Sequence, residues 1–218
     1  MSRPLPCTFF ERPVLEVARD LVGCTFLCDV VGGRLVEVEA YRSDDPASHS
    51  YRGRTARNAA MFGPAGHLYV YFTMGLHFCV NVVCGAEGEA AAVLLRALEP
   101  TTGLELMRAR RGLDDPRRLC NGPAKLTQAL DITRADYGAS ACEAGGRFGF
   151  FAREHGVGGA LDTGGAHTAD DSASGGRGAP RILATPRIGV AAAHDTPWRF
   201  VDADSAFLSR PLSRASRR

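Results

Sequence analysis

The stretch TFLCDVVGGRLVEVEAY, residues 25–41, decides the fold of this chain. Its apolar and β-branched residues predict two strands, and the pair Gly32 and Gly33 is typical of a short hairpin turn between them. We therefore expect an antiparallel sheet to start here.

The second of these strands carries two carboxylates in an otherwise apolar run. Because side chains alternate between the two faces of a strand, one face would hold Val36, Val38 and Ala40. The opposite face would hold Glu37, Glu39 and Tyr41. If that face met only solvent, the pattern would be ordinary. The open question is whether one glutamate is instead held in a pocket for catalysis.

A helix is predicted before these strands and a loop after them. Residues 11–23 show helical spacing of apolar side chains, with Pro13 suited to the first turn and Gly23 suited to the end. Residues 42–64 are polar and rich in turn-forming residues, so they predict a loop.

More strands are predicted beyond this loop. Residues 67–84 carry aromatic and β-branched side chains in rough alternation, which predicts a hairpin bent near Gly75. Residues 90–100 predict a buried strand that Pro100 stops.

The second half of the chain adds helices and short strands. Helices are predicted over residues 103–112 and 121–132, the second with Asn121 as its cap. Short strands are predicted over residues 147–154 and 181–193.

The remaining segments set the domain organisation. Residues 156–179 consist mainly of glycine, alanine, serine and aspartate, so they cannot bury enough apolar surface to order and predict a mobile loop. Trp198 is the expected anchor of the C-terminal part. The fold class is α+β, with one mixed α/β domain over residues 1–218 around an antiparallel sheet.

Composition indicates a globular protein that acts away from membranes. The 218 residues are 45% hydrophobic and 23% charged, which excludes disorder over the whole chain. No apolar run reaches the roughly 18 residues needed to span a bilayer. Seven cysteines without paired spacing favour buried free thiols over a zinc site. With no secretory signal, we expect a reducing cytoplasm and, in a bacterium, association with the nucleoid.

No common catalytic motif is present. The glycines follow no phosphate-binding spacing, and neither a Gly-x-Ser-x-Gly elbow nor a His-Glu-x-x-His helix occurs. What stands out is a set of aromatic and polar residues on nearby predicted strands, with a carboxylate and an arginine among them: Glu39, Tyr41, His49, Tyr69, Tyr71, Asn81 and Arg96. Such a set suits a planar heterocyclic substrate.

Five blocks in order resemble the alkyladenine (3-methyladenine) DNA glycosylase family. They are VEVEAY, ASHSYRGRTARNAAMF, GHLYVYFTMGLHFCVNVV, AVLLRALEP and NGPAKLTQAL, followed by a weaker match at TPRIGV. The resemblance covers somewhat over half of the chain. It implies a curved antiparallel sheet with a protruding β-hairpin, similar in architecture to a formyltransferase C-terminal domain.

The resemblance also implies an activity. Such enzymes flip alkylated or deaminated purines out of double-stranded DNA and hydrolyse the N-glycosidic bond, without metal or cofactor and without cleaving the abasic site. The implied lesions are 3-methyladenine, 7-methylguanine, hypoxanthine and ethenoadenine. The chain would act as a monomer.

The catalytic residues follow from the motifs. Glu39 matches the catalytic glutamate, which would activate water and stabilise positive charge on the sugar. Arg96 matches the arginine that helps to hold the water. The backbone carbonyl of Ile188 would be a further water contact.

The base-binding residues are matched in the same way. Tyr41, His49 and Tyr71 would enclose the flipped base, with Ala47 beside them. Asn81 would obstruct the exocyclic amino group of normal guanine. Tyr69, by contrast, is interpreted as core.

The chain departs from the family at the residue that fills the gap left by the flipped base. Met74 stands where a tyrosine is expected, and an apolar methionine can take that role in the minor groove; the alternative is a core methionine of the hairpin. Arg54, Arg57 and His77 are the candidate phosphate contacts.

Two other functions remain open. The chain could be a different enzyme on a related fold, such as a formyl transferase or a small-molecule hydrolase that uses Glu39. It could also be a damaged-DNA-binding protein with weak or no catalysis, although the pairing of Glu39 with Arg96 disfavours this.

Overall fold

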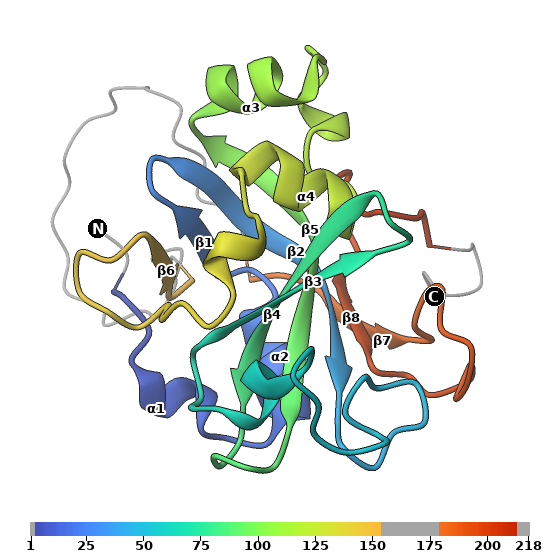
Figure 1. The fold of residues 1–218 in the computed structure, drawn as a ribbon. Coiled ribbons are helices and arrows are strands. Elements are labelled where there is room, and N and C mark those ends of the chain that lie inside the picture. The colour runs from blue at the N-terminus through green and yellow to red at the C-terminus, as the bar shows by residue number, and fades with distance from the viewer. Residues whose placement is uncertain (1–2, 154–178, 213–218) are drawn as a thin grey trace, which may run out of the picture.

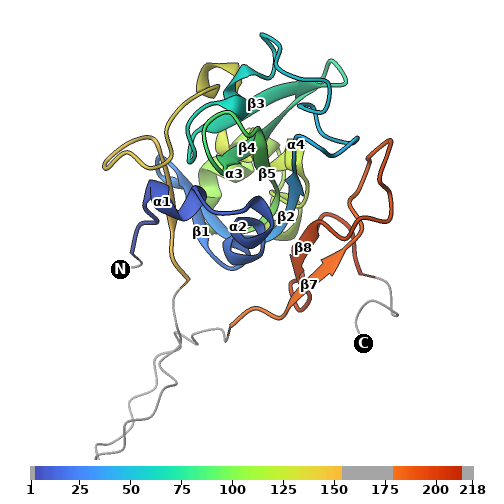
Figure 2. The ribbon, with the colours of Figure 1, turned by 90° about the horizontal axis from the view of Figure 1, so that it is seen from below.

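An antiparallel sheet forms the frame of the molecule (Figure 1). The computed structural model describes residues 3–153 and 179–212. The strands are β1 (Thr25–Cys28), β2 (Val31–Tyr41), β3 (Leu68–Thr73), β4 (His77–Cys84), β5 (Ala91–Thr102), β6 (Phe148–Phe151), β7 (Ile182–Thr185) and β8 (Arg199–Asp202). Their order is β3-β4-β5-β2-β1-β6, and β8 pairs with both β2 and β7. Viewed along its strands, the sheet is curled (Figure 2).

The turn between β1 and β2 is not at the predicted glycine pair. Cys28 pairs with Val31, so the turn lies at Asp29 and Val30, while Gly32 and Gly33 lie inside β2. A Cβ at Gly32 would lie 2.1 Å from a backbone oxygen of β1, and one at Gly33 would lie 1.9 Å from a backbone oxygen of β5. These glycines therefore allow close approach of the strands on both sides of β2.

Two register shifts interrupt the pairing of β2 with β5. Leu35 pairs with Leu98, Glu37 with Ala97 and Val38 with Leu95, which leaves Val36 and then Arg96 as extra residues. The expectation that Val36 shares a face with Val38 and Ala40 is therefore wrong. Val36 packs in a separate cluster with Ala97, whereas Val38 belongs to the main core. Bulges of this kind redirect side chains, and here they bring Arg96 to the face of Glu37 and Glu39.

β3 and β4 form the hairpin predicted around Gly75, and β3 is an edge of the sheet. β5 does not stop at Pro100 but continues to Thr102. The proline is tolerated there because it stands opposite Gly33, next to a register irregularity where a missing N–H costs little.

The helices flank the sheet. They are α1 (Cys7–Phe10), α2 (Val14–Leu21), α3 (Leu104–Arg111) and α4 (Pro123–Leu130), with short 3₁₀ turns at Ala59–Phe62, Pro116–Arg118 and Arg134–Asp136. α2 packs against β2 and β5, and α4 against β4 and β5. Asn121 is not the cap of α4, because Gly122 holds that position and the Asn121 side-chain oxygen accepts from Lys125 instead.

The described residues form three groups of buried apolar side chains. The main core lies between the sheet and α2 and α4, and partly buried Trp198 packs against it, as expected for an anchor. A smaller cluster joins Val36 and Ala97 to the C-terminal segment. A third gathers around Met61 and Tyr69, beneath the hairpin.

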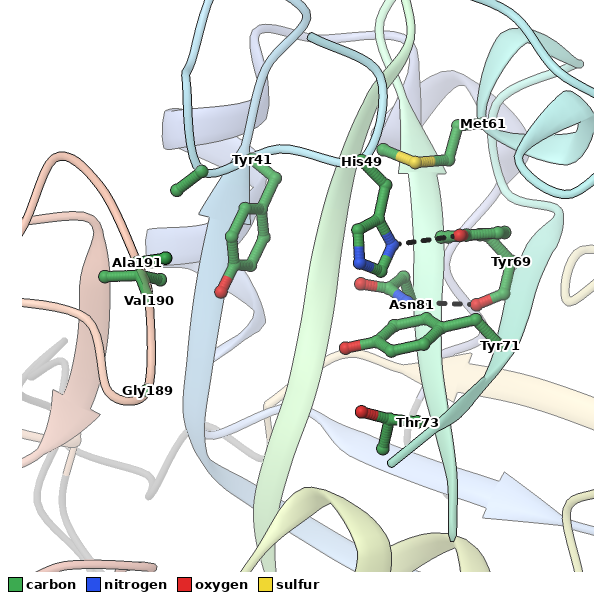
Figure 3. Close-up of a pocket in the computed structure, with 11 residues that line it drawn as sticks. Tyr41, His49, Met61, Tyr69, Tyr71, Thr73, Asn81, Gly189, Val190 and Ala191 are labelled. Atoms are coloured by element: carbon green, nitrogen blue, oxygen red, sulfur yellow. Dashed lines mark hydrogen bonds between the residues drawn. The ribbon is translucent and has the colours of Figure 1, made fainter. Parts of the chain in front are cut away.

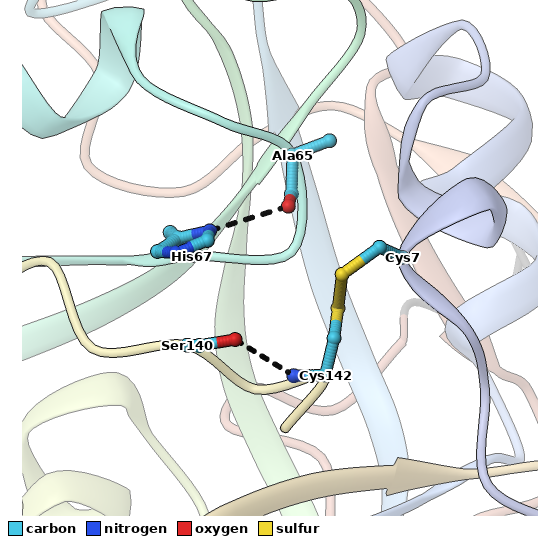
Figure 4. Close-up of a disulfide and its surroundings, with 5 residues drawn as sticks. All are labelled: Cys7, Ala65, His67, Ser140 and Cys142. Atoms are coloured by element: carbon cyan, nitrogen blue, oxygen red, sulfur yellow. Dashed lines mark hydrogen bonds between the residues drawn. A yellow bond between two sulfur atoms is a disulfide. The ribbon is translucent and has the colours of Figure 1, made fainter. Parts of the chain in front are cut away.

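Two of the seven cysteines are not free thiols, contrary to expectation. Cys7 and Cys142 form a disulfide that joins α1 to the segment before β6 (Figure 4). The other five are free and buried. An isolated antiparallel bridge between His67 and Ser140 lies beside the disulfide. The disulfide therefore lies in a region that backbone pairing already holds together.

Two sequence predictions concern long segments of the chain: the predicted mobile loop and the absence of a membrane-spanning run. The predicted mobile loop, apart from Ala179, lies outside the described residues. No helix in residues 3–153 or 179–212 is long and apolar enough to cross a membrane.

Candidate active site

Glu39 is a fully buried carboxylate with three donors around it. It is 0% exposed. The Tyr41 hydroxyl donates to Oε2 over 2.8 Å and Arg96 Nη1 donates to the same oxygen over 3.1 Å. The backbone N–H of Ile188 donates to Oε1 over 2.7 Å. This set of donors fits an ionised carboxylate, and the structure thus brings together Glu39, Arg96 and Ile188 from three separate segments.

Ile188 contacts the glutamate through its amide N–H. The sequence prediction concerned its carbonyl as a water contact, and that role stays a prediction. The amide donates to Oε1 and Arg96 donates to Oε2, so the two contacts hold the carboxylate by both oxygens.

Glu37 holds Arg96 in place. Arg96 Nε and Arg199 Nε each donate to Glu37 Oε1 over 2.8 Å, and the backbone N–H of Ser209 donates to Oε2 over 2.7 Å. Burial would raise the pKa of Glu37, but Arg199, Arg96 and Ser209 outweigh it and hold that pKa below its usual value. The cluster therefore contains two carboxylates, Glu37 and Glu39, and two guanidinium groups, those of Arg96 and Arg199. Glu37 is a structural neighbour of Glu39 and is not exposed to solvent.

A cavity of about 210 Å³ opens beside this cluster, and Tyr41, Ala47, His49, Met61, Tyr69, Tyr71, Thr73, Asn81, Gly189, Val190 and Ala191 line it. All five predicted base-binding residues are among them. Figure 3 shows Tyr41 on β2 facing His49, Asn81 and Tyr71 across the open space. Pockets for drug-sized ligands measure about 300–1,000 Å³, so this one suits a group no larger than a nucleobase.

Tyr69 is a core residue, as the sequence indicates, and it also forms part of the cavity wall. Its ring is buried, yet it stacks beside Tyr71 with 5.5 Å between centroids, because residues two apart in a strand share a face. Its hydroxyl lies 3.0 Å from His49 Nδ1. The His49 ring stands edge-on to Tyr71 at 4.6 Å. Tyr69 therefore fixes the orientation of His49.

The titratable groups of the wall are held neutral. Burial, with the charge of Arg57, lowers the pKa of His49 below its usual value of 6.5. Burial raises the pKa of Tyr69 to about 12, and burial with the nearby Glu39 charge raises the pKa of Tyr41 well above its usual value. At neutral pH the Tyr41 hydroxyl is therefore a donor to Glu39.

Asn81 has one side of its amide fixed by backbone. Its Nδ2 donates to the carbonyl of Tyr69 over 3.0 Å. The side-chain oxygen consequently faces the space between Tyr71 and Tyr41 (Figure 3). The cavity thus offers one hydrogen-bond acceptor at a fixed place.

Glu39 itself does not line the cavity, but it accepts a hydrogen bond from Tyr41, which does. Among the described residues, three donors occupy three of the roughly four lone-pair sites of its carboxylate.

The hairpin tip carries exposed apolar side chains. Met74 is 88% exposed, which excludes a core role, and its backbone is left-handed with φ 53°. Leu76 and Phe72 are exposed beside it. Arg57 Nη2 donates to the carbonyl of Phe72 over 3.0 Å, so this arginine is tied to the hairpin.

The remaining candidate phosphate contacts lie on the surface. Arg54 and His77 are both exposed, the first in the loop after β2 and the second at the start of β4. Within the described part of the chain, no cluster of three or more His, Cys, Asp or Glu side chains could hold a metal ion.

Sequence reasoning missed several residues that build this site. Arg199 and Ser209 reach Glu37 from the C-terminal segment, and Arg187 reaches Asp45 in the loop after β2. Their sequence context gives no signal, because each pair is separated by 142 residues or more. For Tyr69, the spacing of two from Tyr71 was a usable signal.

Known proteins resemble this chain over most of its length. The family described as methylpurine-DNA glycosylase matches residues 8–206. Relatives named "Putative 3-methyladenine DNA glycosylase" include one from Rhodopseudomonas palustris, 51% identical over 94% of this chain and 88% of its own length. Others come from Granulibacter bethesdensis, at 47% over 99% of this chain and 91% of its own, and Methanoculleus marisnigri, at 46% over 94% and 98%. The chain therefore belongs to the methylpurine-DNA glycosylase family.

Proposed function

We propose that this chain, a DNA glycosylase by family, is a monofunctional enzyme that hydrolyses the N-glycosidic bond of damaged purines in duplex DNA. The lesions are alkylated or deaminated purines: 3-methyladenine, 7-methylguanine, hypoxanthine and ethenoadenine. The enzyme acts as a monomer and leaves an abasic site. The observation that carries the proposal is a buried carboxylate directly behind a nucleobase-sized aromatic cavity.

The chemistry uses a lone pair of the Glu39 carboxylate. A water molecule donates one proton to the carboxylate while its oxygen attacks C1′ of the sugar, and the bond from C1′ to the purine nitrogen breaks. The purine leaves with the bonding electron pair. The negative charge of Glu39 also stabilises the oxocarbenium-like transition state. Arg96 supports this role, because its Nη1 donates to Glu39 Oε2 and holds the carboxylate in place.

The cavity receives the base after it has left the duplex. Extrusion costs a few kcal/mol and is cheapest for a damaged or mispaired base. Stacking on Tyr41 and Tyr71 offsets part of that cost, by roughly 1 to 3 kcal/mol per base. Met74 fills the gap in the duplex. The Asn81 side chain, fixed by its bond to the Tyr69 carbonyl, obstructs the exocyclic amino group of normal guanine by a steric clash.

Hydrolysis without cleavage of the abasic site fits the residues at hand. A lyase reaction needs an amine nucleophile, and no lysine is among the described residues that line the cavity. Lys125 lies at the start of α4, where its Nζ donates to Asn121 over 2.9 Å.

The test uses duplex oligonucleotides that each carry one lesion, with an undamaged duplex as control. After incubation, strand breaks are expected only when alkali is added, because alkali cleaves abasic sites. Breaks without alkali would show a lyase. Lesion binding without any breaks would instead identify a damaged-DNA-binding protein.

A further inference from the structure

Asp45 and Arg187 form a buried ion pair next to the site. Their side chains are 1% and 0% exposed. Arg187 Nη2 donates to Asp45 Oδ1 over 3.0 Å, and Nη1 donates to Oδ2, so the contact is bidentate. It joins the loop after β2 to the segment after β7, two segments 142 residues apart.

The pair also touches the surroundings of Glu39 on two sides. Arg187 Nη1 donates to the carbonyl of Ala40, the next residue along β2, over 3.1 Å. The guanidinium carbon lies 4.8 Å from the ring centroid of Tyr41, whose hydroxyl donates to Glu39. The residue after Arg187 is Ile188, whose N–H is 2.7 Å from the Glu39 carboxylate.

Stability alone is a weak explanation for this pair. Removing two charges from water costs several kcal/mol per ion, and apolar replacements are often as stable. Arg187 Nε is moreover buried without a hydrogen-bond partner among the described residues, which adds to the cost. The pair instead gives a planar, bidentate geometry that fixes direction as well as distance.

We propose that Arg187 and Asp45 are positioning residues that set the Ile188 N–H and the Tyr41 ring against Glu39. The ion pair joins the loop that carries His49 to the segment that carries Ile188. It thereby holds both segments in a single position relative to the Glu39 carboxylate. This inference rests on the proposed function, because it assigns the pair to the step that Glu39 performs.

The test is Arg187→Lys, which keeps the charge but loses the bidentate fork. We expect the single-turnover rate of hypoxanthine release to fall about 10- to 100-fold, since small misplacements cost that much. The Kd for a duplex that contains hypoxanthine and the melting temperature of the protein should change little. Hydrogen exchange of the Ile188 amide should accelerate.

Arg181→Lys is the matched control, because Arg181 also pairs with an aspartate, Asp204, but at the surface. It should leave the rate and the exchange unchanged.

The outcomes separate the two proposals. An unchanged rate in an active, folded Arg187→Lys variant would overturn the positioning role while leaving the glycosylase intact. Equal losses in rate and in lesion affinity would also overturn it, because they indicate a general loss of the pocket. If the lysine variant does not fold, Asp45→Asn, which keeps the side-chain shape, is judged by the same criteria. A wild-type protein that releases no base, although its Ile188 amide exchanges hydrogen slowly, would instead contradict the proposed function.

Discussion

The two glutamates of β2, Glu37 and Glu39, have different surroundings, and we infer that they have different roles. Glu37 accepts four hydrogen bonds, from Arg96, Arg199 and Ser209. Glu39 accepts three from the described residues, from Tyr41, Arg96 and Ile188, and it lies beside a cavity. A strand pattern places both on one face, but only their partners distinguish the structural carboxylate from the catalytic candidate.

The first prediction concerns the structural carboxylate. Glu37→Gln leaves Arg96 and Arg199 short of one buried negative charge, so the free energy of unfolding should fall by about 3–5 kcal/mol, as when one partner of a buried ion pair is removed. Urea denaturation at pH 7 measures it. Glu105→Gln is the control, because that side chain is 85% exposed and should change little. Equal stability of the two variants would contradict the role given to Glu37.

The second prediction concerns pH and His49. Burial and the charge of Arg57 both disfavour the imidazolium, so the pKa lies below 6.5 and His49 is neutral at pH 7. It takes up a proton only as the pH falls below 6.5. Arg57→Gln should raise that pKa by removing the repulsion, yet leave it below 6.5 because burial is the larger cause. NMR titration of the imidazole measures both, and a wild-type pKa at or above 6.5 would contradict the structure.

At the residue scale, the sequence predicted the candidate site residues better than the ion pairs that hold them in place. Glu39, Arg96 and the five base-binding candidates meet at one place, and all of them come from the sequence blocks that resemble the glycosylase family. The pair of Asp45 with Arg187 has no corresponding signal in the resemblance. Its existence depends on how two distant segments meet, which neither alternation nor spacing records.

Among the elements, periodicity predicted helices and strands well and irregularities poorly. The helix α2 and the hairpin of β3 and β4 follow directly from apolar spacing. The bulges at Val36 and Arg96 do not, because an extra residue in one strand is defined only by its partner strand. The pair Gly32 and Gly33 predicts a turn wrongly, because the strands that require glycine there are defined only by the folded sheet.

The hairpin gives the third prediction. Met74 is exposed at its tip, so Met74→Ala should slow excision from duplex DNA several-fold but leave excision from single-stranded DNA nearly unchanged, since only the duplex needs its gap filled. Single-turnover rates on the two substrates measure this. Leu106→Ala removes another exposed apolar side chain, on α3, and should affect neither rate. Equal slowing of both substrates by Met74→Ala would exclude the wedge role.

For the molecule as a whole, the disulfide is the feature that sequence could not predict. Seven cysteines without motif spacing leave the pairing open, and only the fold brings Cys7 beside Cys142. The likeness to a formyltransferase domain also concerns the whole molecule and stays a prediction.

The fourth prediction tests the disulfide. Alkylation of the denatured, unreduced protein should modify five of the seven cysteines. Reduction should lower the free energy of unfolding by about 4–5 kcal/mol, because the bond closes a loop of more than one hundred residues in the unfolded chain. Cys142→Ser should remove the response to reductant. Modification of all seven cysteines would show that the bond is absent.

The central claim is that Glu39 activates the water that releases the base. Glu39→Gln keeps the size of the side chain and its acceptor oxygen but removes the charge and the base. The direct measurement is the single-turnover rate of hypoxanthine release from duplex DNA, together with the Kd for the same duplex. The rate should fall by about 100- to 10,000-fold, the contribution of general base catalysis, while the Kd stays close to that of the wild type. A variant that releases hypoxanthine at the wild-type rate would contradict the mechanism.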